Sequence, residues 1–105
     1  MRAQLTWQSG ILVRVWVSGH AAAQELCVAV SCLLRSCALA VEDLQAGAYP
    51  LEWDLALPEE GAFAWRLDDW GAELTGRLQG ISLVLACGLR RLAEDYPDLE
   101  LFVDT

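Results

Sequence analysis

Residues 18–31 decide how this chain is interpreted, because a strand pattern changes into a helix pattern within them. They are Ser18-Gly19-His20-Ala21-Ala22-Ala23-Gln24-Glu25-Leu26-Cys27-Val28-Ala29-Val30-Ser31. His20 is the only histidine of the 105 residues, so a cysteine activated by an imidazole has to use it. Cys27 stands near the start of the expected helix, where the positive end of the helix dipole favours the thiolate form. The segment therefore offers His20 and Cys27 as a candidate catalytic pair.

Before this segment, apolar and polar residues alternate over two short stretches. Ala3, Leu5 and Trp7 alternate with polar residues, and the alternation resumes over residues 11–17, after Ser9-Gly10. A period of two residues is typical of strands, and a two-residue turn between two such stretches predicts a hairpin.

After the segment, the pattern predicts a helix over residues 24–44, apolar around most of its circumference and ended by Gly47. Such a helix is expected to be covered by a sheet and by something else. A third strand is predicted over residues 49–55, a turn over 58–61 and a fourth strand over 63–67. Asp68-Asp69 is expected to cap a second helix.

The second predicted helix, residues 72–95, has apolar residues at steps of three or four, and Pro97 ends it. These residues are Leu74, Leu78, Ile81, Leu85, Leu89 and Leu92. A last strand follows over residues 99–103. The order β-β-α-β-β-α-β predicts an α+β fold with two layers, in which two long helices cover a mostly antiparallel sheet. We expect one domain over residues 1–105.

The composition is that of a globular protein, with 55% hydrophobic and 21% charged residues. The formal net charge of −8 disfavours direct nucleic-acid binding, which needs clustered Lys and Arg, and favours a basic protein or peptide as partner. The first seven residues lack the apolar run of a signal peptide. Residues 81–89, the longest apolar run near the end, are too short to cross a bilayer. We therefore expect a cytoplasmic protein without a membrane partner.

The four cysteines are expected to be reduced thiols. Cys27, Cys32 and Cys37 lie on one predicted helix, where they cannot pair with each other, and their five-residue steps do not bring them to one side as zinc ligands. No metal is therefore expected. Cys32, Cys37 and Cys87 are interpreted as packing residues, and from the residues alone Cys27 is open to the same interpretation.

A family resemblance bears on that choice. Gly19-His20-Ala21 followed by Leu26-Cys27-Val28-Ala29-Val30-Ser31 resembles the signature of the ribosomal-processing cysteine proteases, the Prp or YsxB-like family. That family has Gly-His-Ala, a loop, and then Val-Cys-Ala-Ala-Val-Ser opening a helix. The chain's size, its element order and its Glu94-Asp95-Tyr96-Pro97 at the end of the second helix are also similar.

The resemblance implies a homodimeric cysteine endopeptidase that removes the amino-terminal extension of large-subunit ribosomal protein twenty-seven during ribosome assembly. By the same resemblance, Cys27 is the nucleophile, His20 is the general base, and no cofactor is needed. The family usually has a longer, glycine-containing loop between these two residues, and an aspartate where this chain has Gln24. A non-catalytic ribosome-assembly or protein-binding module with the same fold is the alternative.

Three further residues near the pair are expected to support it. Gln24 or Glu25 could orient the imidazole through a side-chain oxygen. Gly19 would let backbone or peptide approach His20 closely. Farther along, the helical glycines Gly76, Gly80 and Gly88 predict a close approach of another backbone, such as a dimer partner's. The five tryptophans are expected to fill the core, with Trp16 a candidate exception.

Overall fold

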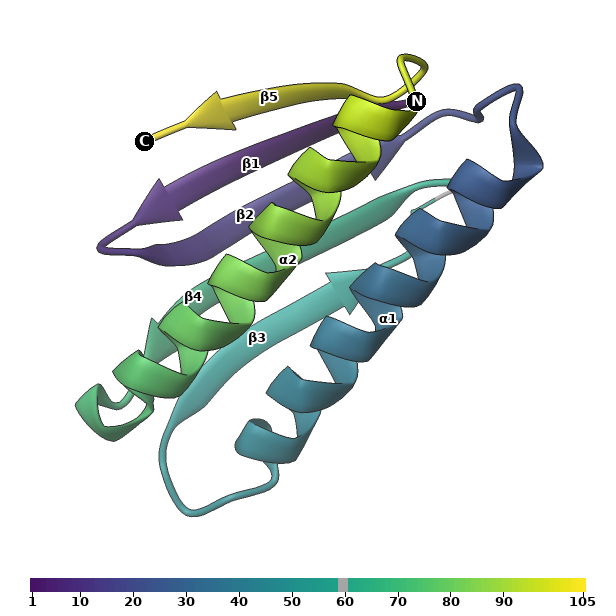
Figure 1. Ribbon diagram of the computed structural model, residues 1–105. Coiled ribbons are helices and arrows are strands. Elements are labelled where there is room, and N and C mark those ends of the chain that lie inside the picture. The colour runs from purple at the N-terminus through teal and green to yellow at the C-terminus, as the bar shows by residue number, and fades with distance from the viewer. Residues whose placement is uncertain (59–60) are drawn as a thin grey trace.

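A five-stranded sheet carries two long helices on one face (Figure 1). The computed structural model describes residues 1–58 and 61–105. Its elements are β1 (Arg2–Gln8), β2 (Ile11–Ser18), α1 (Gln24–Gln45), β3 (Leu51–Ala56), β4 (Phe63–Trp70), the short 3-10 helix η1 (Ala72–Leu74), α2 (Thr75–Asp95) and β5 (Glu100–Asp104). The α+β class, the two layers and the element order predicted from the sequence are confirmed.

The strand order in the sheet is β3-β4-β2-β1-β5. The pairs β1–β2, β2–β4 and β3–β4 are antiparallel, whereas β1 and β5 are parallel, with Arg2 opposite Glu100. The predicted hairpin turn is present at Ser9 and Gly10, whose φ angles are 54° and 76°. Two left-handed residues match the twist of the flanking strands, so this turn sets the register of β1 and β2.

The core lies between the sheet and the helices. Val15, Val17 and Trp65 of the sheet are nearly fully buried, together with Leu34 of α1 and Leu85 of α2. These residues follow the alternation of the strands and the helical stripes that the sequence shows. Trp65 also donates from its indole nitrogen to the backbone oxygen of Leu12, over 3.3 Å, which satisfies its one polar group.

Helix α1 packs against the sheet and, along one flank, against α2. Its outer surface leaves Val28 61% and Leu39 59% exposed. By length and composition, with a mean hydropathy of 1.5, α1 is long and apolar enough to cross a membrane. In this fold the side of α1 that carries Leu26, Val30 and Leu34 is buried against the rest of the molecule. Apolar helices that form part of a protein core pass the same test of length and composition.

Several local predictions were wrong. Asp68 and Asp69 lie within β4 and do not cap a helix; Gly71 precedes η1, and no side chain caps that helix. Asp68 instead forms ion pairs of 2.9 Å with Arg14 of the neighbouring strand β2 and with Arg66 of its own strand β4. The third strand begins at Leu51 rather than at residue 49. Of the predicted turn over residues 58–61, residues 59 and 60 lie outside the described part of the chain.

The helical glycines differ from one another. A Cβ atom at Gly88 would lie 2.6 Å from Cδ2 of Leu33, so this glycine lets α1 and α2 approach closely. A Cβ atom at Gly76 or Gly80 would meet nothing within 4 Å. The close neighbour at Gly88 is therefore a side chain rather than a backbone, and the described residues provide no such neighbour at Gly76 or Gly80.

Candidate active site

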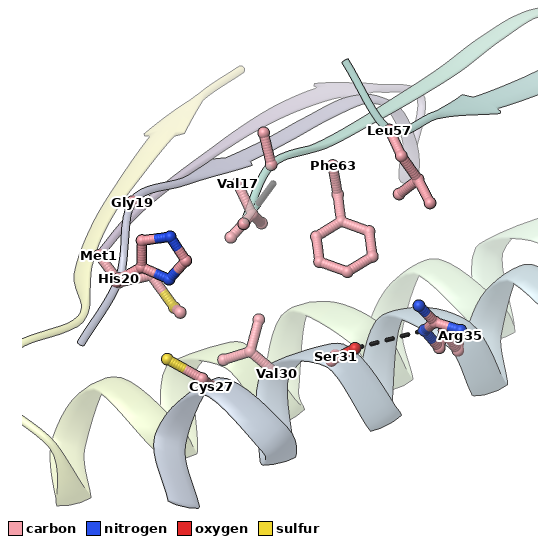
Figure 2. A pocket seen from close by; sticks show the side chains of 12 residues that line it. Met1, Val17, Gly19, His20, Cys27, Val30, Ser31, Arg35, Leu57 and Phe63 are labelled. Carbon is pink, nitrogen blue, oxygen red and sulfur yellow. Dashed lines mark hydrogen bonds between the residues drawn. The ribbon is translucent and has the colours of Figure 1, made fainter. Parts of the chain in front are cut away.

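A cavity of about 490 Å³ opens where β2 leads into α1. It lies between the end of the sheet and the first turns of α1 (Figure 2). Its walls comprise Met1, Val17, Gly19, His20, Cys27, Val30, Ser31, Arg35, Leu57, Gly61, Ala62 and Phe63. The sheet contributes one wall and α1 the other, so both predicted catalytic residues reach the same cavity.

Cys27 lies in the first turns of α1 and is half-buried. Its Sγ accepts a hydrogen bond from the backbone N–H of Ala21 over 3.4 Å. No side chain caps the start of this helix, where Ala23 is the N-cap residue. The N–H of Leu26 donates to the backbone oxygen of Ala23 over 3.2 Å, so the amides of Gln24 and Glu25 are the candidates at this helix start for an oxyanion that forms beside the sulfur.

His20 lies in the loop after β2, on the sheet side of the cavity, and is exposed. Figure 2 shows its ring and the sulfur of Cys27 directed into the cavity from opposite walls. Within residues 1–58 and 61–105, the two side chains form no direct hydrogen bond. The loop brings both side chains to the same cavity, but in this conformation the imidazole of His20 is not hydrogen-bonded to the thiol of Cys27.

The loop between these residues is held by Asp98. Its Oδ2 accepts a hydrogen bond of 3.2 Å from the backbone N–H of Ala22, and its backbone oxygen accepts one of 3.0 Å from the amino group of Met1. Ala21 is tied to Cys27 next to this point. The short loop is thus anchored both to α1 and to the turn before β5. Sequence reasoning missed Asp98, because nothing near His20 or Cys27 in the sequence indicates it.

The predicted supporting residues occupy different positions. Gly19 lines the cavity with a φ of 87°, and a Cβ atom there would lie 3.6 Å from Cα of Met1. Gln24 and Glu25 are exposed in the first turn of α1, and Gln24 borders a shallow depression on the outer side of Cys27. In the described part of the chain, neither donates to or accepts from His20.

The part of the cavity away from His20 is largely apolar. Val30, Leu57 and Phe63 line it, and Arg35 stands at its end with its Nε donating to the hydroxyl of Ser31 over 3.3 Å (Figure 2). Such a surface is suited to an apolar group of a ligand.

The other cysteines are also free thiols, as predicted. Cys37 is only 6% exposed in the core, as expected of a packing residue, whereas Cys32 and Cys87 are exposed, so that prediction was wrong for these two. Burial raises the pKa of the Cys37 thiol, because the thiolate loses hydration there. Over residues 1–58 and 61–105, no three His, Cys, Asp or Glu residues gather as a metal would require.

Comparison with solved structures gives matches over nearly the whole chain. The ribosomal processing protease Prp from Staphylococcus aureus, in complex with a substrate peptide, superposes with a TM-score of 0.77 at 18% identity, covering 98% of each chain. The chain has the Prp fold. The same protease with a covalently linked product peptide gives a TM-score of 0.72 at 21% identity, again covering 98% of each chain.

A third match to the Prp fold is SMU.848 from Streptococcus mutans, with a TM-score of 0.65 at 21% identity over 98% of this chain and 94% of the other. No protein-family model and no curated protein matches the sequence. The resemblance noted in the sequence is therefore confirmed at the level of the fold.

Proposed function

We propose that this chain is a cysteine endopeptidase that removes the amino-terminal extension from the precursor of large-subunit ribosomal protein twenty-seven during ribosome assembly. The observation that carries the proposal is that His20 and Cys27, from the two halves of the motif, line one cavity in a Prp fold. The two solved Prp complexes contain a substrate peptide and a covalently linked product peptide. A covalent peptide adduct is the kind of species that nucleophilic catalysis forms.

In this proposal His20 removes the thiol proton of Cys27, and the thiolate attacks the scissile carbonyl carbon. The C–N bond breaks as the imidazolium of His20 gives its proton to the leaving amine, and a thioester remains on Cys27. Water then attacks the thioester, its proton passes to His20, and the thiol and a free carboxylate are released. Uncapped amides at the start of α1 stabilise the oxyanion in both steps.

The proposal requires the ring of His20 and the sulfur of Cys27 to come together when substrate binds, because no hydrogen bond joins them within the described residues. Catalytic hydrogen bonds are often long before substrate binds and shorten in the complex. His20 is exposed on a loop, so such a movement displaces no packed core residue. Gly19, with its left-handed backbone, leaves room for a peptide next to the ring. Gln24 or Glu25 remains the candidate for orienting the imidazole.

Other parts of the proposal follow the resemblance. The enzyme is a single protease domain over residues 1–105 that works in the cytoplasm as a homodimer, on a protein precursor, without cofactor, membrane or direct nucleic-acid contact. The net charge of −8 suits a basic substrate such as a ribosomal protein tail. Sedimentation equilibrium would contradict the dimer if the protein stays monomeric at every concentration tested.

The deciding experiment incubates the purified protein with the ribosomal protein precursor of the same organism. The wild-type protein is expected to release the extension, and Cys27→Ala or His20→Ala to slow this by several orders of magnitude. Cys32→Ala, a change at an exposed cysteine on the same helix, is the matched control and should cleave normally. Cleavage that survives Cys27→Ala would end the proposal.

The second candidate is a ribosome-assembly or protein-binding module that has the fold but no peptidase activity. It is favoured by the absence of a direct His20–Cys27 hydrogen bond within the described residues, and by Gln24 in place of the family's aspartate. In that case the precursor binds without being cut. A pull-down with the precursor, followed by mass spectrometry of both partners, distinguishes binding alone from cleavage.

A further inference from the structure

The ring of His20 lies against Gly61, which stands before β4 in the sequence. A Cβ atom at Gly61 would lie 2.7 Å from Cε1, 2.9 Å from Nε2 and 3.3 Å from Nδ1 of His20. Real Cβ atoms essentially never approach another heavy atom within 3 Å, so any other residue at this position would occupy the space of the imidazole. All three distances involve the ring and none involves the backbone of His20.

The backbone of Gly61 has a φ of 78°, which by itself favours glycine. This explains why the turn accommodates a glycine, but it does not explain why the imidazole occupies the position of the missing side chain. The two properties are separable, because Gly10 has almost the same φ, 76°, and lies in the hairpin turn against the side chain of Gln79.

We propose that Gly61 is a positioning residue for His20: its lack of a side chain leaves a flat surface on which the imidazole rests, facing Cys27 across the cavity, before substrate brings the two groups together. The inference rests on the proposed peptidase function and assigns a role there to a residue that lies outside the motif. Both residues line the same cavity, so the surface that holds the ring is also part of the peptide site.

A Cβ atom at Gly61 would push the ring off this wall. Because His20 is exposed, the ring would turn towards solvent without disturbing the core. The expected consequence is a loss of reactivity at Cys27 with little change in folding beyond the strain of the left-handed backbone. A misplacement of about 1 Å in a catalytic group lowers turnover by up to about 100-fold.

The first test follows the imidazole itself, which gives a unique NMR signal because His20 is the only histidine. The wild-type protein should show a nuclear Overhauser effect between Hε1 of His20 and Hα of Gly61. Gly61→Ala should shift the ring signals, and Gly10→Ala, with the same backbone strain elsewhere, should leave them unchanged. Unchanged ring signals in Gly61→Ala would overturn the inference, whatever the protein does to peptides.

The second test measures how fast iodoacetamide alkylates Cys27, read by peptide mass spectrometry. Gly61→Ala should lower the rate about 10- to 100-fold. Gly61→Asn should do the same, although asparagine tolerates the left-handed backbone, because it too adds a Cβ atom. Gly10→Ala should stay within about twofold. A normal rate in Gly61→Asn would mean that backbone strain alone was responsible, and would overturn the inference.

A double-mutant comparison separates positioning from general damage. In a His20→Ala background no ring remains to be displaced, so adding Gly61→Ala should not lower the alkylation rate further. An equal loss in both backgrounds would overturn the inference. If His20→Ala itself leaves the rate unchanged, the proposed function fails, and the ring signals of the first test still decide whether Gly61 holds the imidazole.

Discussion

The sulfur of Cys27 accepts a hydrogen bond of 3.4 Å from the backbone N–H of Ala21, the residue that follows His20. The loop bearing the imidazole and the first turn of α1 are therefore linked at the cavity. A donor directed at sulfur stabilises negative charge on it. The resting structure thus supplies one partner for a thiolate while His20 is still unengaged.

We expect Cys27 to be the most reactive cysteine at neutral pH, although it is less exposed than Cys32 or Cys87. Thiolate character and not exposure alone controls the reaction. Iodoacetamide should modify Cys27 at least several-fold faster than the two exposed thiols, as read by peptide mass spectrometry. His20→Ala should reduce this advantage without abolishing it, because the N–H of Ala21 still faces the sulfur. If iodoacetamide modifies the exposed Cys32 and Cys87 faster than Cys27, the thiol of Cys27 is not activated.

Asp98→Ala should loosen the loop between the two candidate catalytic residues, because the Oδ2 atom of Asp98 accepts the N–H of Ala22. We expect precursor cleavage to fall by about 10-fold through misplacement of the pair. Asp95→Ala, which removes only an exposed pair with Arg91, is the control and should be nearly neutral. Equal effects of the two substitutions would show that the loop contact is unimportant.

Among the described residues, Ser82 is the one polar residue that is buried, with 2% of its surface exposed. Its hydroxyl accepts a 2.9 Å hydrogen bond from the backbone N–H of Leu12, close to the irregularity in the β1–β2 pairing. Ser82→Ala should lower the free energy of unfolding by about 1–3 kcal/mol, since it leaves that N–H without its acceptor. Urea unfolding measures this, with the exposed Ser36→Ala as a control expected within about 0.5 kcal/mol of wild type.

The helical glycines give a graded prediction for stability. Gly76→Ala and Gly80→Ala should each raise the free energy of unfolding by about 1 kcal/mol, because alanine favours the helix and both sites have room. Gly88→Ala should raise the free energy of unfolding by less than this, or lower it, because the added methyl group meets the side chain of Leu33. In a Leu33→Ala background the gain at Gly88 should return. Equal increases in the free energy of unfolding at all three glycines in the wild-type background would contradict the close contact between Gly88 and Leu33.

The burial of Cys37 predicts that the folded protein loses stability at alkaline pH. Burial raises the pKa of its thiol in the folded protein, so the unfolded chain loses this proton at a lower pH than the folded one. The unfolded state then binds fewer protons, and the free energy of unfolding falls as pH rises past the ordinary thiol value of about 8.5. Below that pH the contribution is fully present. Cys37→Ala should flatten the alkaline slope measured by urea unfolding, whereas Cys32→Ala should not.

The sequence predicted those parts of the fold that depend on local pattern. The alternation around Ser9-Gly10 gave the hairpin, and the stripes of residues 24–44 and 72–95 gave both helices. Asp68-Asp69 was misinterpreted because a capping signal and the end of a strand look alike until the neighbouring strand, on which Arg14 pairs with Asp68, is known. Tertiary contacts decided that case.

The part of the candidate site that depends on local sequence was also predictable. His20 and Cys27 are near neighbours in sequence, and a motif marks them. Gly61 and Asp98 come to the site only through the sheet order and the parallel pairing of β1 with β5. No spacing rule connects them to His20, so only the three-dimensional arrangement identifies them.

The contact between Ala22 and Asp98 has a consequence for protein synthesis. The two residues are separated by 76 positions, and the ribosome makes Ala22 long before Asp98. A nascent chain that has formed β1, β2 and α1 therefore still has an unanchored loop, since contacts so distant in sequence form late. If the proposed cleavage depends on that anchor, a partly translated chain is inactive, and the proposed peptidase activity begins only after the turn before β5 has emerged and docked.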